Sequence, residues 1–145
     1  MLYLDASALV KRYVEEKVRE QLEIRLRSAQ ETYTSTITYA EVHAALARKY
    51  REGELTKAEF NRAGNDFEKD WLELQEVSVN AETLSPVRVL VGVVRLRGMD
   101  AIHLAAAVWL ERKFGEKPDI VTSDRRLFPA AQTFGFVVWD PAGAL

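Results

Sequence analysis

The chain contains no cysteine, and this absence excludes several kinds of site at once. Disulfide bridges, thiolate metal centres and cysteine nucleophiles all need that side chain. Only two histidines are present, so imidazole ligands are also scarce. Any metal site in this chain is therefore expected to depend mainly on oxygen ligands such as carboxylates.

Long apolar runs are absent as well. No uncharged run approaches the roughly 20 residues that a membrane-spanning helix requires. The first residues, MLYLDASALVKRY, lack the basic start of a secretory signal, and Asp5 interrupts their apolar stretch. The net charge of −2 argues against a chain that coats nucleic acid through bulk positive charge, while a local basic rim remains possible. We expect a cytoplasmic protein with no membrane partner.

What is present is an ordinary globular composition. The 145 residues are 48% hydrophobic and 29% charged, which is enough apolar material for a sizeable core. The sequence contains no internal repeat, low-complexity tract or Gly/Ser linker. We therefore expect residues 1–145 to form a single domain.

The hydrophobic pattern alternates short strands with helices. Periodicity and β-branched content predict strands at 1–4, 32–37, 74–79, 118–123 and 136–140. Helices are predicted at 6–14, 15–29, 38–52, from 56 onward, at 86–96, at 99–114 and briefly within 124–135. Such alternation favours an α/β fold with a parallel sheet covered by helices on both faces.

Three local patterns support these helix predictions. Gly53 is a stop for the helix over 38–52, and Thr56 with Glu59 forms a capping-box pattern at the next helix start. Residues 86–96 are valine-rich, which favours a strand, but their apolar side chains recur at helical spacing. We predict a helix there, with Ser85-Pro86 as its cap and first turn.

Two carboxylates directly follow predicted strands. Asp5 comes after the first strand, and Asp124 comes after the strand at 118–123. Each of them, taken alone, is better explained as the N-cap of the helix that follows. Since sites in parallel α/β sheets lie at the carboxyl ends of strands, the two side chains are also expected to lie at one edge.

Two further acids stand in largely apolar helices. Asp100 lies in the first turn of its helix, where the helix dipole favours a negative charge, yet an ionised carboxylate is costly to bury unless something pairs with it. His103 lies on the same face, and we favour a hydrogen-bonded, half-buried role for it over a ligand role. Glu41 has apolar neighbours, and an ion pair with Arg48 is its simplest alternative explanation.

Together the four acids indicate a cation site. Carboxylates that lie close together repel and raise each other's pKa unless a cation intervenes. Oxygen ligands without cysteine favour Mg²⁺ or Mn²⁺, and such ions bind phosphate oxygens and activate water. His43 and His103 both lie in apolar helices, so a Ser-His-Asp triad is not indicated.

Four segments in order resemble the PIN-domain family, and within it the VapC-type toxins of toxin–antitoxin pairs. They are LYLDASALVKRYV, TSTITYAEVHAAL, LRGMDAIHLAAA and IVTSDRRL, and they span residue 2 to about residue 127. Ala6 stands where many relatives carry Thr. The stretch 53–75 and the segment around Pro86 lie outside the motifs, so the substrate is not transferred by the resemblance.

The resemblance implies a fold, an activity and a set of partners. The fold is a three-layer α/β/α sandwich around a central parallel sheet. The activity is Mg²⁺- or Mn²⁺-dependent endoribonuclease cleavage by metal-activated water, and the partners are RNA, a VapB-type antitoxin and a second copy of the chain in a homodimer. The implied catalytic and metal-binding residues are Asp5, Glu41, Asp100 and Asp124, with Ser7 and Thr122 as supporting hydroxyls.

RNA would have to approach an acidic pocket, so basic residues are expected around it. The candidates, each of which also fits an ordinary surface role, are Lys11, Arg12, Arg48, Lys49, Arg125 and Arg126. Two other functions remain open. One is a non-catalytic PIN-like binding module in which the acids are caps and ion pairs. The other is an Asp-based phosphoryl-transfer domain, which the Asp5-Ala6-Ser7 sequence fits poorly because such phosphatases usually carry Asp-x-Asp.

Overall fold

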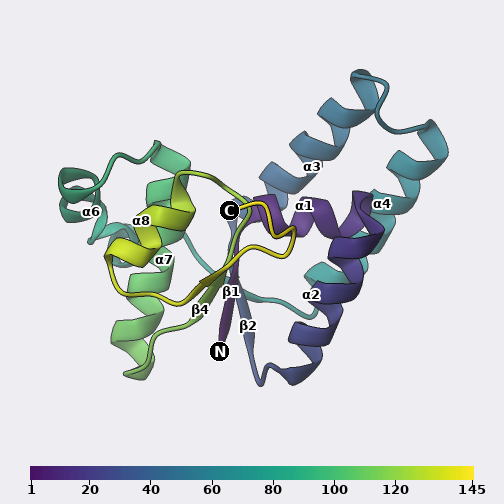
Figure 1. Ribbon diagram of the computed structural model, residues 1–145. Helices are drawn as coiled ribbons and strands as arrows, with labels where there is room; N and C mark the ends of the chain where they lie inside the picture. The colour runs from purple at the N-terminus through teal and green to yellow at the C-terminus, as the bar shows by residue number, and fades with distance from the viewer.

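The computed structural model covers residues 1–145 and describes every side chain except that of Glu16. The described residues form five strands and eight helices (Figure 1). In chain order these are β1 (Leu2–Leu4), α1 (Ala6–Val14), α2 (Glu16–Ser28), β2 (Thr32–Ser35), α3 (Ile37–Arg51), α4 (Lys57–Trp71), β3 (Gln75–Val77), α5 (Ala81–Leu84), α6 (Val87–Val93), α7 (Gly98–Phe114), β4 (Asp119–Val121), α8 (Leu127–Thr133) and β5 (Val138–Trp139).

All five strands belong to one parallel sheet with the order β3-β2-β1-β4-β5. Strand β1 lies in the centre, with Tyr3 opposite Tyr33 on one side and Ile120 on the other. Because the strands are parallel, the residues that follow β1 and β4 emerge at the same edge. The backbone N–H of Asp5 donates to the carbonyl of Val121 at 3.2 Å, which joins the two strand ends directly.

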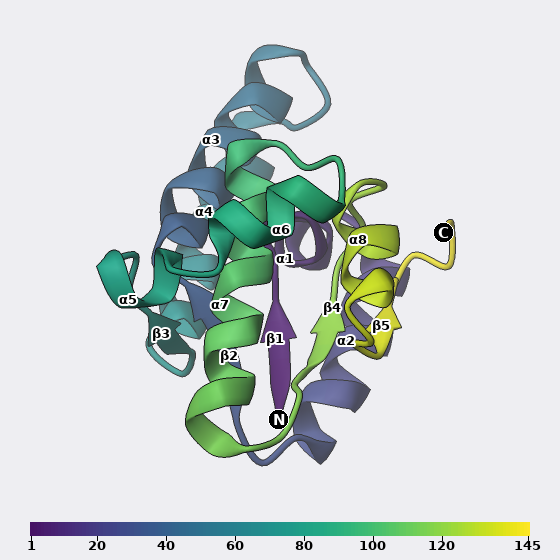
Figure 2. The same cartoon turned by 90° about the vertical axis from the view of Figure 1, so that its left-hand side faces the viewer.

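Helices cover both faces of the sheet, so the predicted α/β sandwich is confirmed. Successive side chains of β1 point to opposite faces, as a strand requires. Leu2 and Leu4 pack into a core formed with α1 to α4, whereas Tyr3 packs into a second core formed mainly with α7 and α8. Figure 2 shows α5, α6, α7 and α8 over the second face. The sheet is therefore buried on both sides.

The local helix signals have clear physical counterparts. The capping box predicted at Thr56 is present, because its hydroxyl accepts from the Glu59 N–H while the Glu59 carboxylate accepts from the Thr56 N–H. Helix α3 ends before Gly53, which has a positive φ of 77° that glycine adopts without strain. Among the helices of the described chain, none has the length and apolar character needed to cross a membrane.

One local prediction is wrong, and one short helix of the structure was not predicted. Residues 87–93 are helical as predicted, but Ser85 does not cap that helix, because Ser85 ends the short preceding helix α5. That helix was not predicted. It forms because the Asn80 side chain accepts from the N–H groups of Glu82 and Thr83, which satisfies the free donors of its first turn.

Candidate active site

Asp5 lies directly after β1, and its carboxylate accepts hydrogen bonds from several donors. Its Oδ1 accepts from the N–H of Ala8 at 3.1 Å, so the residue caps α1. The Ser7 hydroxyl lies 2.8 and 2.9 Å from the two carboxylate oxygens, and the Thr122 hydroxyl donates to Oδ2 at 2.9 Å. The capping role and the two supporting hydroxyls thus occur together at one carboxylate.

Burial opposes the charge on Asp5. The side chain is only 4% exposed, and this desolvation raises the pKa of Asp5 above its usual value. The nearby His103 and the hydrogen bonds from Ser7, Ala8 and Thr122 act in the opposite direction and do not cancel the effect. A cation beside Asp5 would favour its ionised form.

Asp124 lies at the neighbouring strand end, in the loop between β4 and α8. Its Oδ1 accepts from the N–H groups of Arg126 at 2.7 Å and Leu127 at 2.9 Å, so Asp124 caps the turn that leads into α8, while the N-cap residue of α8 itself is Arg126. The N–H of Asp124 donates to the Thr122 hydroxyl at 3.0 Å. Since Thr122 also donates to Asp5, one threonine holds both carboxylate-bearing loops in place.

Asp100 joins this edge from the first turn of α7. Its Oδ2 accepts from the N–H of Arg97 at 3.2 Å. Burial raises the pKa of Asp100, and the negative charge of Asp124 raises it further. Asp100 and Asp124 are therefore close enough to repel each other, although they belong to different elements.

Glu41 reaches the same region from α3, and its partner is a histidine. The His103 Nε2 lies 2.8 Å from Glu41 Oε2, so the expected alternative of a pair with Arg48 is not what the structure contains. His103 Nδ1 lies 2.8 Å from the Tyr3 hydroxyl, and the imidazole is only 3% exposed. The predicted hydrogen-bonded role of His103 is confirmed, and its burial is more complete than expected.

Three of the four acids lie around His103, which pairs with Glu41 and lies within Coulombic range of Asp5 and Asp100, while Asp124 approaches Asp100. Within the described part of the chain, however, no three His, Asp or Glu side chains form a group ready to hold a metal ion. The donor chemistry still fits a hard divalent cation, because the donors are oxygens and burial raises the pKa of both Asp5 and Asp100.

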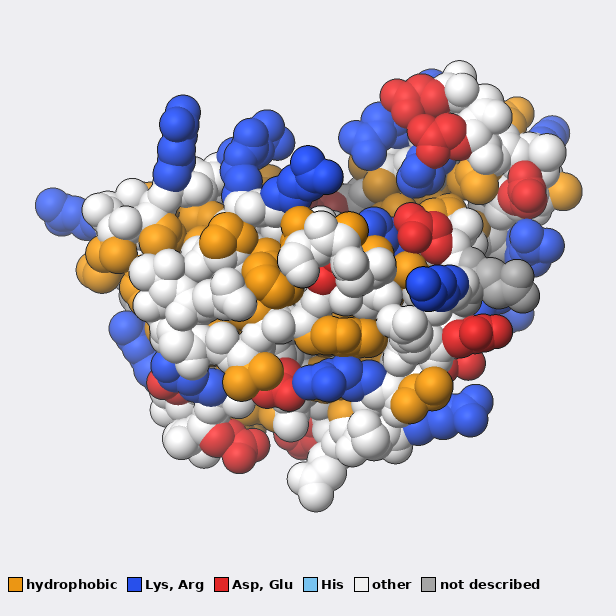
Figure 3. Space-filling model, in the orientation of Figure 1, with side chains coloured by type: hydrophobic (Ala, Val, Ile, Leu, Met, Phe, Trp, Pro, Cys, Tyr) orange, Lys and Arg blue, Asp and Glu red, His pale blue; other side chains and the backbone are white. Residues whose placement is uncertain are grey.

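A cleft lined by arginines adjoins these acids. Arg95, Arg97 and Arg126, together with Leu96, line a volume of about 430 Å³. The backbone N–H groups of Arg97 and Arg126 are the donors to Asp100 and Asp124, so this cleft lies beside the carboxylates. Figure 3 shows Lys and Arg side chains on both sides of the hollow at the top of the molecule, between the α3–α4 hairpin and the side that carries α6 to α8.

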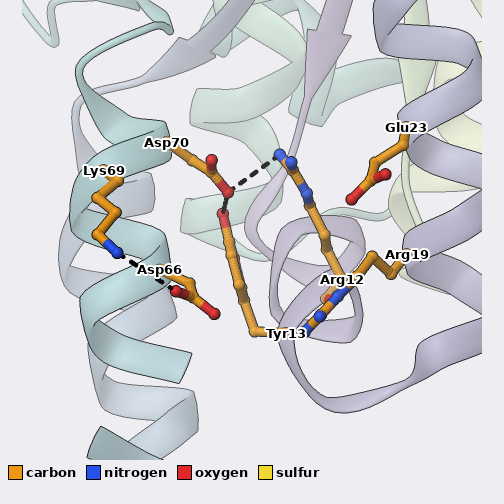
Figure 4. Close-up of a pocket in the computed structure, with 7 residues that line it drawn as sticks. All are labelled: Arg12, Tyr13, Arg19, Glu23, Asp66, Lys69 and Asp70. Carbon is orange, nitrogen blue, oxygen red and sulfur yellow. Dashed lines mark hydrogen bonds and ion pairs between the residues drawn. The ribbon is translucent and has the colours of Figure 1, made fainter. Parts of the chain in front are cut away.

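The structure changes the expected composition of this basic rim. Arg126 lies at the cleft as predicted, while Arg95 and Arg97 were not predicted, although their position just before Asp100 in RLRGMD was visible. Arg12 points elsewhere. Figure 4 shows it in a separate pocket between α1 and α4, where it lies 3.2 Å from Asp70. Lys49 is likewise engaged by an acid, at 2.5 Å from Glu54.

Comparison with known proteins identifies the family. A family model of the PIN domain matches residues 2–132, which is most of the chain. This chain belongs to the PIN domain family. The family membership predicted from the four sequence segments is thereby confirmed.

Relatives of this PIN domain protein extend over nearly its whole length. Ribonuclease VapC47 from Mycobacterium tuberculosis (strain CDC 1551 / Oshkosh) is 33% identical over 146 residues, covering 97% of each chain. Ribonuclease VapC3 from Pyrobaculum aerophilum is 34% identical over 137 residues, covering 91% of this chain and 98% of the relative.

Solved structures agree on the fold. FitAcB from Neisseria gonorrhoeae matches 99% of each chain with a TM-score of 0.66 at 18% identity. A toxin–antitoxin complex from Klebsiella pneumoniae matches 97% of this PIN domain protein and 98% of its own chain, with a TM-score of 0.64 at 19% identity. At such identities the likeness establishes the shared architecture.

Proposed function

We propose that residues 1–145 form one nuclease domain, a metal-dependent endoribonuclease of the VapC type that acts as the toxin of a toxin–antitoxin pair. One observation carries the proposal: Asp5, Asp100 and Asp124 lie at one edge of a PIN-type sheet, beside a cleft lined by arginines. The names of the two VapC relatives, each a ribonuclease, support the same activity.

The residues of the proposed site divide into those that would hold the cation and those that orient them. Asp5, Asp100 and Asp124 would hold Mg²⁺ or Mn²⁺, and Glu41 would complete the site or position the attacking water. When bound, the cation would activate water and offset negative charge on the phosphate oxygens. Ser7 and Thr122 keep the Asp5 carboxylate in one orientation, because Ser7 donates to both of its oxygens and Thr122 donates to Oδ2.

The activity is tested on total bacterial and archaeal RNA. The protein is incubated with Mn²⁺ or with EDTA, and new RNA ends are mapped by sequencing. We expect discrete new ends that require Mn²⁺, and no cleavage of DNA of the same length range. Mn²⁺ binding without any new RNA end would instead favour the non-catalytic binding module, and a stable acyl-phosphate after treatment with acetyl phosphate would favour phosphoryl transfer.

Metal binding predicts a rise in thermal stability. A ligand that binds only the native state stabilises it by about 2.7 kcal/mol at 100 times its Kd. For a chain of this size that corresponds to a Tm increase of roughly 5–10 °C. Scanning calorimetry should show this increase with Mn²⁺ in the wild type and in an Asp66→Asn control, since Asp66 lies in the separate pocket of Figure 4.

The double variant Asp100→Asn/Asp124→Asn should lose that response to Mn²⁺, because it lacks the two carboxylates that repel each other in the metal-free protein. EDTA should abolish the response in every protein. An equal Tm increase in the double variant would place the cation elsewhere on the molecule.

If arginines of the cleft contact RNA phosphates, the affinity for RNA should depend on the salt concentration. Each arginine that contacts a phosphate of a single strand contributes about 0.7 to the slope of log K against log salt concentration. Replacing Arg95, Arg97 and Arg126 together by Gln should therefore reduce the slope by about 2. Fluorescence anisotropy with a short single-stranded RNA measures this in an Asp100→Asn background with EDTA, in which cleavage is not expected. Arg112→Gln, on the opposite end of α7, should leave the slope unchanged.

The proposal includes two protein partners. A VapB-type antitoxin is supported by the toxin–antitoxin complex among the structural neighbours. The helices expected to hold it are α3, which presents exposed Tyr39 and Tyr50, and α4, whose C-cap Leu72 is exposed. A homodimer is our second proposal, and it can use the exposed valines of α6, Val89 and Val93. The cytoplasmic location expected from the sequence stays a prediction.

A further inference from the structure

We propose that Tyr3 and His103 form a buried hydrogen-bonded relay that positions the Glu41 carboxylate in the nuclease site. His103 is then a positioning residue, because it acts through Glu41 and not on the substrate. The inference rests on the proposed function, since it assigns a task to a group beside the proposed metal-binding carboxylates.

The relay joins three separate elements of the fold. Tyr3 comes from the central strand β1, His103 from α7 and Glu41 from α3. The two hydrogen-bond distances, from the Tyr3 hydroxyl to His103 Nδ1 and from His103 Nε2 to Glu41 Oε2, are both 2.8 Å. The aromatic rings meet edge to face, with centroids 6.0 Å apart and planes at 70°.

Burial fixes the first two members of this relay and leaves the third accessible. Tyr3 is 0% exposed and His103 is 3% exposed, so neither ring can reorient without disturbing the core. The Glu41 side chain is 25% exposed. The relay therefore connects two side chains that are fixed in the core to a carboxylate at the surface. Water or a hydrated cation can reach that carboxylate.

The chemistry of the three groups determines the direction of the hydrogen bonds. An ionised carboxylate only accepts, so His103 Nε2 carries the proton that it donates to Glu41. A phenol is protonated at neutral pH, so the Tyr3 hydroxyl can donate to Nδ1. A proton on Nε2 thus satisfies the contact with Glu41, while Nδ1 meets the Tyr3 hydroxyl. Glu41 Oε2 accepts from His103, whereas Oε1 takes no part in the relay.

Packing alone does not account for these side chains. An apolar residue at position 103 would fill the core without buried polar atoms that need partners. The imidazole instead lies within Coulombic range of Asp5 and Asp100 while it holds Glu41. Partners that orient ligating groups in this way typically change metal affinity or activity 10- to 100-fold when they are removed.

The chain offers a matched control on α3, the helix that carries Glu41. His43 Nε2 lies 2.8 Å from Glu68 Oε1, the same kind of contact at the same distance. That pair is on the surface, with side chains 36% and 48% exposed. Both pairs are therefore histidine–glutamate contacts, but only the pair of His103 and Glu41 adjoins the proposed site.

The test compares His103→Leu, His103→Gln and Tyr3→Phe with the control His43→Leu in the full chain. Calorimetric titration with Mn²⁺ measures metal affinity, and RNA cleavage is followed in parallel. We expect His103→Leu to weaken Mn²⁺ binding by about 10- to 100-fold. Tyr3→Phe should weaken it less, because only the anchor of the ring is lost. His103→Gln, which keeps an N–H for Glu41, should recover most of the affinity, and His43→Leu should match the wild type.

A second measurement needs no variant and no metal. Nitrogen-15 NMR of the imidazole groups in the metal-free wild type should find a proton on Nε2 of His103. The Nδ1–H tautomer would overturn the relay, and so would Mn²⁺ affinities of folded His103→Leu and Tyr3→Phe equal to that of the control. A wild type that neither binds Mn²⁺ nor cleaves RNA would instead overturn the proposed function, which is a separate outcome.

Discussion

Replacement of Asp5, Asp100 or Asp124 by Asn is expected to reduce RNA cleavage by about 100-fold or more, the effect of removing one group that stabilises developing charge. Each substitution removes a negative charge and keeps the size of the side chain. The measurement is the initial rate of cleavage of a labelled RNA with saturating Mn²⁺. Asp70→Asn, which alters the carboxylate that pairs with Arg12 outside the site, is the control and should retain activity.

Asparagine is the informative substitution because it separates two roles of the same residue. Asp5 caps α1 and Asp124 caps the turn before α8, and Asn is about as good an N-cap as Asp. If the acids served only as caps, the Asn variants would fold and function like the wild type. Unchanged cleavage in all three variants would therefore support the structural explanation and refute the catalytic one.

The stability of the Asn variants is also predictable in sign. Burial raises the pKa of Asp5 in the folded protein, so ionisation of this side chain at neutral pH opposes folding. At low pH the neutral Asp5 side chain contributes fully to the stability of the fold. This contribution is lost as the pH rises through the pKa of Asp5 in the folded protein. Asp5→Asn removes that cost, and we expect the metal-free variant to melt at or above the temperature of the wild type at pH 7.

Phe67→Ala is expected to destabilise the fold by about 3–5 kcal/mol, the usual cost of deleting a buried aromatic side chain. Phe67 is 0% exposed and lies on α4. Its ring contacts Tyr13 of α1, with centroids 5.7 Å apart, and His43 of α3, with centroids 5.2 Å apart. The ring therefore holds the α3–α4 hairpin of Figure 1 against α1, and its loss leaves a cavity where three helices meet.

Urea denaturation followed by circular dichroism measures this effect. The midpoint should fall while the slope of the transition stays the same, because the surface exposed on unfolding is little changed. Leu72→Ala is the matched control, since that side chain is 82% exposed and should alter stability by less than about 0.5 kcal/mol. A loss below about 1 kcal/mol for Phe67→Ala would mean that α4 is not part of the cooperative core.

Features that depend on near neighbours in the chain were predictable. The Thr56–Glu59 capping box joins residues three apart, and the strand patterns before Asp5 and Asp124 depend on alternation over a few residues. The parallel sheet followed from the alternation of strands and helices, and its geometry implied that Asp5 and Asp124 would share an edge. The order of the motifs was sufficient to indicate the PIN domain family.

Other features were decided only by tertiary structure, because they depend on distances between elements that no local pattern encodes. Glu41 and His103 are 62 positions apart, and they become partners only because α3 and α7, on opposite faces of the sheet, both reach the edge where β1 and β2 end. Arg97 and Arg126 reach one cleft because Asp100 and Asp124, which their backbones hold, approach each other in space. The sequence by itself determined which carboxylates stand at strand ends and helix starts. The fold determined which side chains hold them there, since hydrogen bonds and charge–charge contacts act across space and not along the chain.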